Sequence, residues 1–207
     1  MSDNQPVTVV ITGASGSIYG VRLIENLLEA GKGVNLLISD PGFIVLEEEM
    51  GISWKGDELS VNQLVREYFN TDKELIYFDN SNYFSPLASG SSGRGTMVIA
   101  PCSMGTIGRI ASGISANLIE RAADVVLKEK GNLVLLPRET PLNAIHLENM
   151  LMLSRMGARI VPAMPGFYHK PQTMDDLINF VVGKLLDQIG IEHDLVKKWG
   201  AEASATE

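Results

Sequence analysis

The 207-residue sequence contains a single cysteine, Cys102, and only three histidines. One cysteine excludes an intramolecular disulfide and suits a reducing compartment, so we expect a cytoplasmic protein. His146, His169 and His193 are scattered along the chain, and no second soft ligand lies near any of them in sequence. Protein metal sites need several such ligands at short spacing, so we expect no metal.

Long apolar runs and an excess of basic residues are absent as well. The N-terminal segment MSDNQPVTVVITG has no basic region and an apolar run of only about six residues, so we expect neither a secretory signal nor a membrane span. The net charge of −8 gives no basic surface for nucleic acid. Hydrophobic residues make up 45% of the chain and charged residues 20%, which is typical of a globular protein.

Short β-branched segments alternate with longer amphipathic segments along the chain. The pattern predicts strands at 7–12, 34–39, 75–78, 96–101, 133–137 and 159–162. It predicts helices at 18–30, 42–50, 61–69, 117–130, 143–156 and 174–189, and a polar loop at 79–95. Alternation of this kind indicates a parallel sheet, because parallel neighbours need crossover connections.

The predicted fold class is therefore α/β, a three-layer α/β/α Rossmann-like fold with a mainly parallel six-stranded sheet. We expect one domain over residues 1–207, with a core at 6–190 and a C-terminal tail at 191–207. The Met-rich stretch around Met150–Met156 fits either core or an interface between subunits, and we favour core.

Parallel sheets bind ligands beyond the carboxyl ends of their strands, and two small-residue turns follow predicted strands there. These are GASGSIYG at 13–20 and PCSMGT at 101–106. Each opens a helix whose free N–H groups suit a phosphate or a ring edge, although the first is also explained as a tight turn without a ligand. The glycine spacing matches neither dinucleotide fingerprint, which disfavours NAD, although Asp40 stands where a ribose-binding acid occurs.

Other candidate side chains have competing interpretations. Cys102 follows a strand, but no histidine lies near it in sequence, so packing is favoured over a nucleophilic role. Arg121 and Lys128 are seven residues apart on one helix face, where surface ion pairs are an equal alternative. Arg138 stands at a strand end between Pro137 and Pro141, which favours a ligand-binding role over a structural one. Glu49 belongs to three consecutive acids, and the pattern by itself indicates a solvent-exposed carboxylate.

The chain resembles the flavin prenyltransferases, the UbiX family, over residues 7–200. Six ordered motifs carry the resemblance: TGASGSIYG, ASGSSGRGTMVIAPCSMGT, NLIERAADVVLKE, LVLLPRETPLNAIHLENM, PAMPGFYHKPQT and DLVKKWG. The resemblance implies transfer of a dimethylallyl group from dimethylallyl phosphate to N5 and C6 of reduced FMN. It also implies a UbiD-type decarboxylase of ubiquinone or aromatic-acid pathways as recipient of the product, and a homo-oligomer, a dodecamer, whose sites are completed by neighbouring subunits.

The resemblance also implies roles for particular residues. It places FMN contacts at Gly13, Ala14, Ser15, Ser39, Ser103, Met104, Gly105, Thr106 and Arg138. It places the donor phosphate at Arg121, Lys128, Arg138, Glu139, Tyr168 and Lys184, with Ser89 and Gly90 in a nearby loop and Tyr83 and Trp199 offering π-faces. Glu49 matches the acid/base carboxylate, Ser15 the proton relay, and Glu139 stands with the catalytic residues.

The sequence departs from the family pattern at Lys184, where relatives carry Arg, and at Tyr83, where some carry Trp. Both changes bear on donor affinity, since Lys lacks the bidentate fork of Arg. Asp175–Asp176 is followed by Leu-Ile-Asn, so the DDxxD magnesium motif of diphosphate-using synthases is absent. Two alternatives share the flavin loops: a flavin-dependent cysteine decarboxylase, and a non-catalytic FMN carrier or chaperone.

Overall fold

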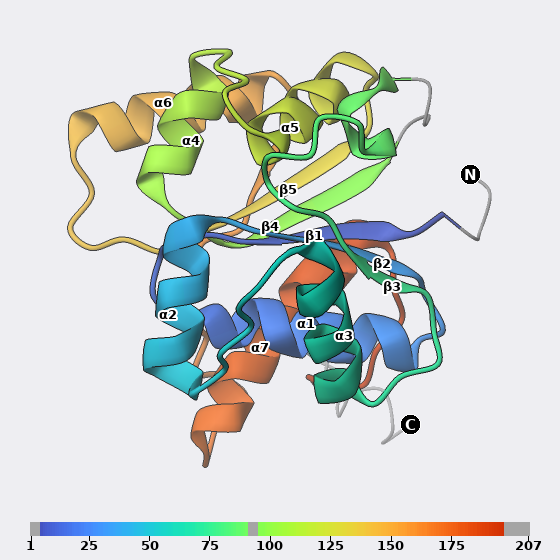
Figure 1. Ribbon diagram of the computed structural model, residues 1–207. Helices are drawn as coiled ribbons and strands as arrows, with labels where there is room; N and C mark the ends of the chain where they lie inside the picture. Colours follow the sequence, from blue (N-terminus) through green and yellow to red (C-terminus); the bar gives the residue numbers. More distant parts are fainter. Residues whose placement is uncertain (1–4, 91–94, 197–207) are drawn as a thin grey trace.

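The sheet of this protein is parallel throughout the part of the chain that the computed structural model describes, residues 5–90 and 95–196 (Figure 1). Its strand order is β3-β2-β1-β4-β5-β6. The strands are β1 (Val7–Ile11), β2 (Val34–Ile38), β3 (Leu75–Tyr77), β4 (Thr96–Cys102), β5 (Asn132–Pro137) and β6 (Arg159–Ile160). The α/β class and the six predicted strands are confirmed, each within two residues of its expected ends.

Helices cover both faces of the sheet, as a parallel sheet requires. One face packs on α1 (Ser17–Glu29), α2 (Asp40–Met50), α3 (Glu58–Phe69) and α7 (Met174–Ile189). The other packs on α4 (Met104–Ala111), α5 (Leu118–Lys128) and α6 (Ala144–Arg155). In Figure 1 these two groups lie below and above the sheet. Every residue of β1 is buried, with Val9 and Ile11 on one face and Val10 on the other.

Local sequence signals set the helix ends. Ser39, Asn117 and Asn143 are N-caps whose side chains accept a backbone N–H from the first turn, which satisfies donors that the helix itself leaves open. Gly51 and Gly190 follow α2 and α7 with φ of 67° and 74°, a conformation that glycine adopts without strain. Because Ser39 caps α2 and Pro41 fits its first turn, α2 begins two residues earlier than the pattern predicted.

The strand order reverses direction between β1 and β4. The chain moves from β1 to β2 on one side and returns by a long crossover to β4 on the other, so the loops after β1 and β4 diverge to opposite faces. Such a switch point leaves a crevice at the carboxyl ends of the strands, which is where this fold class binds its ligands.

Two expectations about the periphery are refined. The loop at 79–95 contains a short 3₁₀ turn, η1 (Pro86–Ala88), whose residues Leu87 and Ala88 pack on the α4–α5–α6 core. Of the expected tail, Ile191, Leu195 and Val196 pack on the opposite core. None of the described helices combines the length and the apolar character that crossing a bilayer demands.

The preference for core around Met150–Met156 was wrong for most of the stretch. Only Leu153 is fully buried there, whereas Leu151, Met152 and Met156 are each about half exposed on α6 at 51%, 49% and 49%. Ile145 and Leu147 on the same helix are exposed as well, at 67% and 53%. A monomer gains nothing from exposing such a run, so this surface has the character of an interface.

Candidate active site

The residues expected to bind flavin gather at the carboxyl ends of β1, β2, β4 and β5. Gly13, Ala14 and Ser15 form the turn between β1 and α1, and Ser39 caps α2 directly after β2. Ser103 caps α4 directly after β4, with Met104, Gly105 and Thr106 in the first turn of that helix. Arg138 is the first residue after β5. The sheet thus brings four sequence-distant segments to one edge.

A buried hydroxyl joins the two loops at the switch point. Thr12 Oγ1 donates to the Pro101 carbonyl at 2.8 Å and accepts from the Ser103 backbone N–H at 2.9 Å. Ser103 Oγ in turn lies 3.0 Å from Thr106 Oγ1. These bonds hold the α4 turn, which carries the hydroxyls of the cradle, in a fixed position beside the end of β1.

Close backbone packing brings the first loop against the second helix. A Cβ on Gly13 would overlap the side chain of Pro41, so only glycine allows the β1–α1 turn to approach α2. Gly16 has a φ of 104°, where other residues are strained. Gly13 and Gly16 are therefore required by the geometry of this turn, whether or not a ligand lies beside it.

Glu49 reaches back from the last turn of α2 to the start of α1. Its carboxylate accepts the Gly16 N–H at 2.9 Å and the Ser17 N–H at 3.0 Å. These two bonds hold the carboxylate at the amino end of α1. Glu49 therefore lies beside Ser15 at the ligand-binding edge, although in sequence it belongs to a run of three exposed acids.

Arg138 has the property expected of a group that waits for an anion. Its Nε is buried and has no hydrogen-bond partner among the described residues. A buried donor without a partner costs about 1–3 kcal/mol, more when it is charged, so a ligand oxygen at this position is favoured. This donor suits an oxygen of either phosphate ester, and the Ser103 and Thr106 hydroxyls with the amino ends of the helices fit a phosphorylated flavin.

The cations expected at the donor phosphate fall into two sets. In the first, Arg121 Nε donates to the Ala88 carbonyl at 3.0 Å, which places it beside Ser89. Lys128 pairs with Glu129, and its Nζ lies 2.7 Å from where a Cβ on Gly90 would stand. Ser89, Gly90, Arg121 and Lys128 are thus brought together between α5 and the loop that precedes β4.

The second set lies on the opposite face of the sheet. The Tyr168 ring is 5.6 Å from the Phe180 ring, and Lys184 Nζ lies 5.7 Å above the same ring. Lys184 also pairs with Asp187 at 3.3 Å. Glu139, next to Arg138, is exposed and accepts its neighbour's N–H at 2.9 Å. Trp199 lies outside the described residues.

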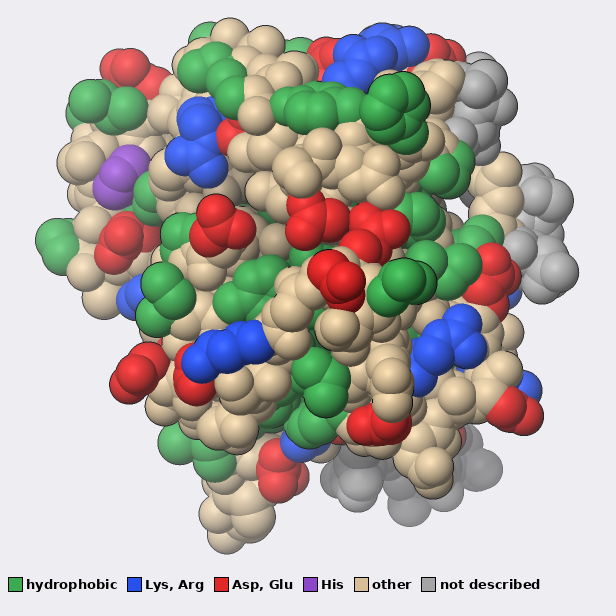
Figure 2. All heavy atoms as spheres, viewed as in Figure 1, with side chains coloured by type: hydrophobic (Ala, Val, Ile, Leu, Met, Phe, Trp, Pro, Cys, Tyr) green, Lys and Arg blue, Asp and Glu red, His purple; other side chains and the backbone are tan. Residues whose placement is uncertain are grey.

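A single chain does not bring the two sets together. Arg121 and Lys128 belong to α5, which packs on one core, whereas Phe180 and its neighbours on α7 pack on the other (Figure 1). Lys128 ends α5 immediately before β5 begins, so it lies toward the amino ends of the strands, away from the flavin loops. In Figure 2 the Lys and Arg side chains also form separate groups on the face in view.

Comparison with known proteins identifies the family. The flavin prenyltransferase UbiX of Halalkalibacterium halodurans is 53% identical over 195 residues, which cover 94% of this chain and 93% of that protein. The chain belongs to the flavin prenyltransferase UbiX family. The broader Flavoprotein family model matches residues 1–186. The resemblance predicted from six motifs is thereby confirmed.

Solved structures of family relatives have the same fold. The dodecameric FMN-dependent UbiX-like decarboxylase from Escherichia coli O157:H7 is 40% identical, with a TM-score of 0.83 over 94% of this chain and 99% of that one. AnUbiX (PadA1), solved with FMN and dimethylallyl pyrophosphate, is 34% identical, with a TM-score of 0.82 over 95% and 97%. A PPC decarboxylase is only 19% identical, with a TM-score of 0.57, so it shares the fold alone.

Two positions at which this chain departs from the family pattern keep polar contacts. Lys184 retains a cation beside Phe180, and Tyr83 Oη donates to the Ser115 carbonyl at 3.4 Å with its ring about half exposed. Among the described residues no three His, Cys, Asp or Glu side chains are grouped so as to hold a metal ion.

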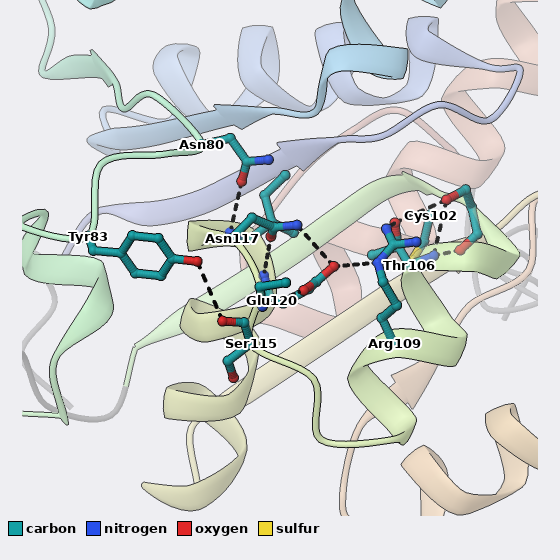
Figure 3. Close-up of polar contacts among 11 residues, drawn as sticks. Asn80, Tyr83, Cys102, Thr106, Arg109, Ser115, Asn117 and Glu120 are labelled. Carbon is teal, nitrogen blue, oxygen red and sulfur yellow. Dashed lines mark hydrogen bonds and ion pairs between the residues drawn. The ribbon is translucent and has the colours of Figure 1, made fainter.

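Sequence reasoning missed a polar network behind the α4 cradle. Glu120 is 1% exposed and pairs with Arg109, whose Nη2 lies 3.4 Å from Thr106 Oγ1 (Figure 3). The available signal was Asn117-x-x-Glu120, a capping-box pattern that places an acid in the first turn of a buried helix. Nothing in the sequence indicated that its partner is Arg109, because the packing of α4 on α5 is a tertiary contact that the pattern of neither helix specifies.

Cys102 tests the nucleophile alternative. Complete burial raises the pKa of its thiol far above the ordinary range, with a smaller opposing effect of Arg109, so the thiol stays protonated at neutral pH. We predict that a thiol reagent such as dithionitrobenzoate reacts with the native protein on the order of a hundredfold more slowly than with free cysteine. Denaturation in guanidinium must release one reactive thiol per chain, and rapid reaction of the native protein would contradict this placement.

Proposed function

We propose that this chain joins the dimethylallyl group of dimethylallyl phosphate to N5 and C6 of reduced FMN. The observation that carries the proposal is the position of Glu49, whose carboxylate is held by two N–H groups of α1 beside Ser15, where the flavin loops converge. This contact also caps α1, but the carboxylate lies at the edge where the flavin loops meet, and closing a ring at C6 requires a base that removes an aromatic proton.

The remaining residues suit the same chemistry. Reduced FMN supplies the electron-rich nitrogen and carbon that form the new bonds. When the carbon–oxygen bond of the donor breaks, phosphate leaves with both bonding electrons, so cations and N–H donors must lie where that negative charge develops. Arg138 offers such a donor from a buried position, and Glu139 stands next to it. Water must be kept from the allylic carbon, a role for aromatic surfaces such as Tyr83 and Trp199.

The donor phosphate site is, in this proposal, completed by neighbouring subunits. One chain holds Arg138 at the flavin edge but carries its other cations on opposite faces of the sheet, which suits their use by adjacent copies. The exposed apolar surface of α6 offers a contact for such copies. A relative in this family forms a dodecamer, and another binds the pyrophosphate ester of the same alcohol.

Two broader proposals follow from the family. The prenylated flavin passes to a UbiD-type decarboxylase. The reaction converts FMN itself into the product and does not regenerate it, so the product is of use only as the cofactor of another enzyme. We also keep the single-domain organisation over 1–207 and the cytoplasm as the expected setting, on the grounds of one continuous sheet and a single cysteine.

The direct test is anaerobic incubation of the protein with reduced FMN and dimethylallyl phosphate, followed by the mass of the extracted flavin. We expect a gain of one five-carbon unit, with no gain when the donor is omitted or the FMN is oxidised. An unchanged flavin together with a thioenol product from a cysteine substrate would indicate the cysteine decarboxylase. Bound FMN with neither product would indicate a carrier.

Glu49→Gln separates the two bond-forming steps. The amide cannot take a proton from C6, so we expect the first bond to the flavin to form while ring closure slows by about 10²–10⁴-fold, the range of a lost general base. Absorbance spectra of the flavin during single turnover would follow the two stages. Glu48→Gln, an exposed neighbour with the same charge change, is the control. Normal ring closure by Glu49→Gln would remove Glu49 from the chemistry.

Mixing two inactive variants tests the shared site. Glu49→Gln damages the flavin side and Lys128→Ala the donor side, so an oligomer reassembled from equal amounts contains some sites with both residues intact if the residues come from different chains. Random assembly gives about a quarter of wild-type activity per site. Co-refolded single variants serve as controls. Absence of recovery in a verified mixed oligomer would place both residues of each site in one chain.

A further inference from the structure

Glu120 is an ionisable side chain buried in the molecule that the proposed chemistry does not use. It is 1% exposed, and besides the Arg109 Nε it accepts the Ala116 N–H at 2.8 Å and an Asn117 side-chain N–H at 2.9 Å. Figure 3 shows this carboxylate between Asn117 and Arg109. It therefore fixes the position of the Arg109 guanidinium from behind, through a charge-assisted bond in a buried setting.

Arg109 is placed very differently from its partner. It lies on α4, and its side chain runs back toward the start of that helix, as helical side chains do. Its Nη1 lies 3.3 Å from where a Cβ on Gly105 would stand, and its Nη2 3.4 Å from Thr106 Oγ1. The side chain is 45% exposed. The guanidinium thus lies along the turn that contains Ser103, Gly105 and Thr106, with part of its surface open.

The two members of this ion pair differ in burial, since the Glu120 side chain is 1% exposed and that of Arg109 45%. A buried ion pair is seldom an efficient source of stability, because desolvation offsets much of the attraction, and Glu120 already has two neutral donors. What the pair achieves is a cation held at a fixed place beside the free N–H groups of a helix start. A cation and a helix start together favour an anion more strongly than either does alone.

We propose that Arg109 is a flavin-binding residue and that Glu120 is the positioning residue that holds it. The inference rests on the proposed function, since it takes the α4 turn as part of the flavin site. The recognised chemistry is an anionic oxygen or ring edge. In FMN this is either the phosphate or the pyrimidine edge, which becomes negatively charged when the flavin is reduced.

Three variants separate binding from simple structural support. Arg109→Gln leaves Glu120 buried without its cation, so both the thermal midpoint and FMN affinity fall. Glu120→Gln frees Arg109 and lowers affinity less. The double variant replaces the ion pair with two amides, which relieves the buried charge and restores most of the thermal midpoint. We expect its dissociation constant for FMN to stay about tenfold above wild type, the scale of one charged hydrogen bond.

The dissociation constant for FMN is measured by flavin fluorescence and the thermal midpoint of unfolding by calorimetry, both in the absence of dimethylallyl phosphate. Lys73→Gln, an exposed residue near β3 with the same charge change as Arg109→Gln, should leave both unchanged. Riboflavin distinguishes the two sources. If the tenfold effect disappears with riboflavin, Arg109 meets the phosphate; if it persists and the midpoint potential of the bound flavin falls, Arg109 meets the ring.

If the double variant recovers both the wild-type thermal midpoint and the wild-type affinity for FMN, the inference is overturned, and Arg109 and Glu120 are structural residues. The outcome is independent of catalysis. A protein that binds FMN but never alkylates it would refute the proposed function and leave this result readable. A protein that alkylates FMN normally with unchanged affinity in the double variant would refute only the role of Arg109.

Discussion

The site depends on one buried hydroxyl, that of Thr12. A parallel sheet places the ends of β1 and β4 side by side, and the Thr12 N–H donates to the Pro101 carbonyl at 3.2 Å, but beyond this bond the two loops diverge to opposite faces. Thr12 Oγ1 ties the loops together there by donating to Pro101 and accepting from the Ser103 N–H. Because Ser103 also caps α4, these bonds fix the β1–α1 turn against the cradle of hydroxyls on α4.

The polar groups at this edge of the sheet differ in how many of their hydrogen bonds are already made. On the flavin side most polar groups have partners: Glu49 is held by α1, and Ser39 and Ser103 cap helices. On the phosphate side Arg138 Nε is buried without a partner among the described residues, and the other cations are turned to the two faces of the sheet. In a site shared between subunits, one chain would hold the flavin in place by itself, and a neighbouring chain would complete the binding of the prenyl donor.

The sequence predicted most of the fold because local signals agreed with it: β-branched runs at the strands, and Ser39, Asn117 and Asn143 at the helix starts. The predicted strand ends also indicated the loops that we expect to bind flavin. The position of Glu49 came only from the family resemblance, since three consecutive acids carry no local sign of a buried partner. The pairing of Arg109 with Glu120 depends on how the consecutive helices α4 and α5 pack together, and the separation of Lys128 from Lys184 depends on the placement of α5 and α7 on opposite faces of the sheet; periodicity encodes neither.

A consequence concerns water. The allylic carbon of the donor must be kept dry, yet in one chain Tyr83 is half exposed and Lys184 lies on the outer surface of α7. If neighbouring copies supply the missing cations, the same contacts also cover these surfaces, so charge capture and exclusion of water arise in one step. An isolated chain then holds the flavin without activating the donor. In the proposed shared site, assembly would therefore be a condition for the chemistry, and the exposed apolar side chains of α6 would serve the reaction as well as the stability of the oligomer.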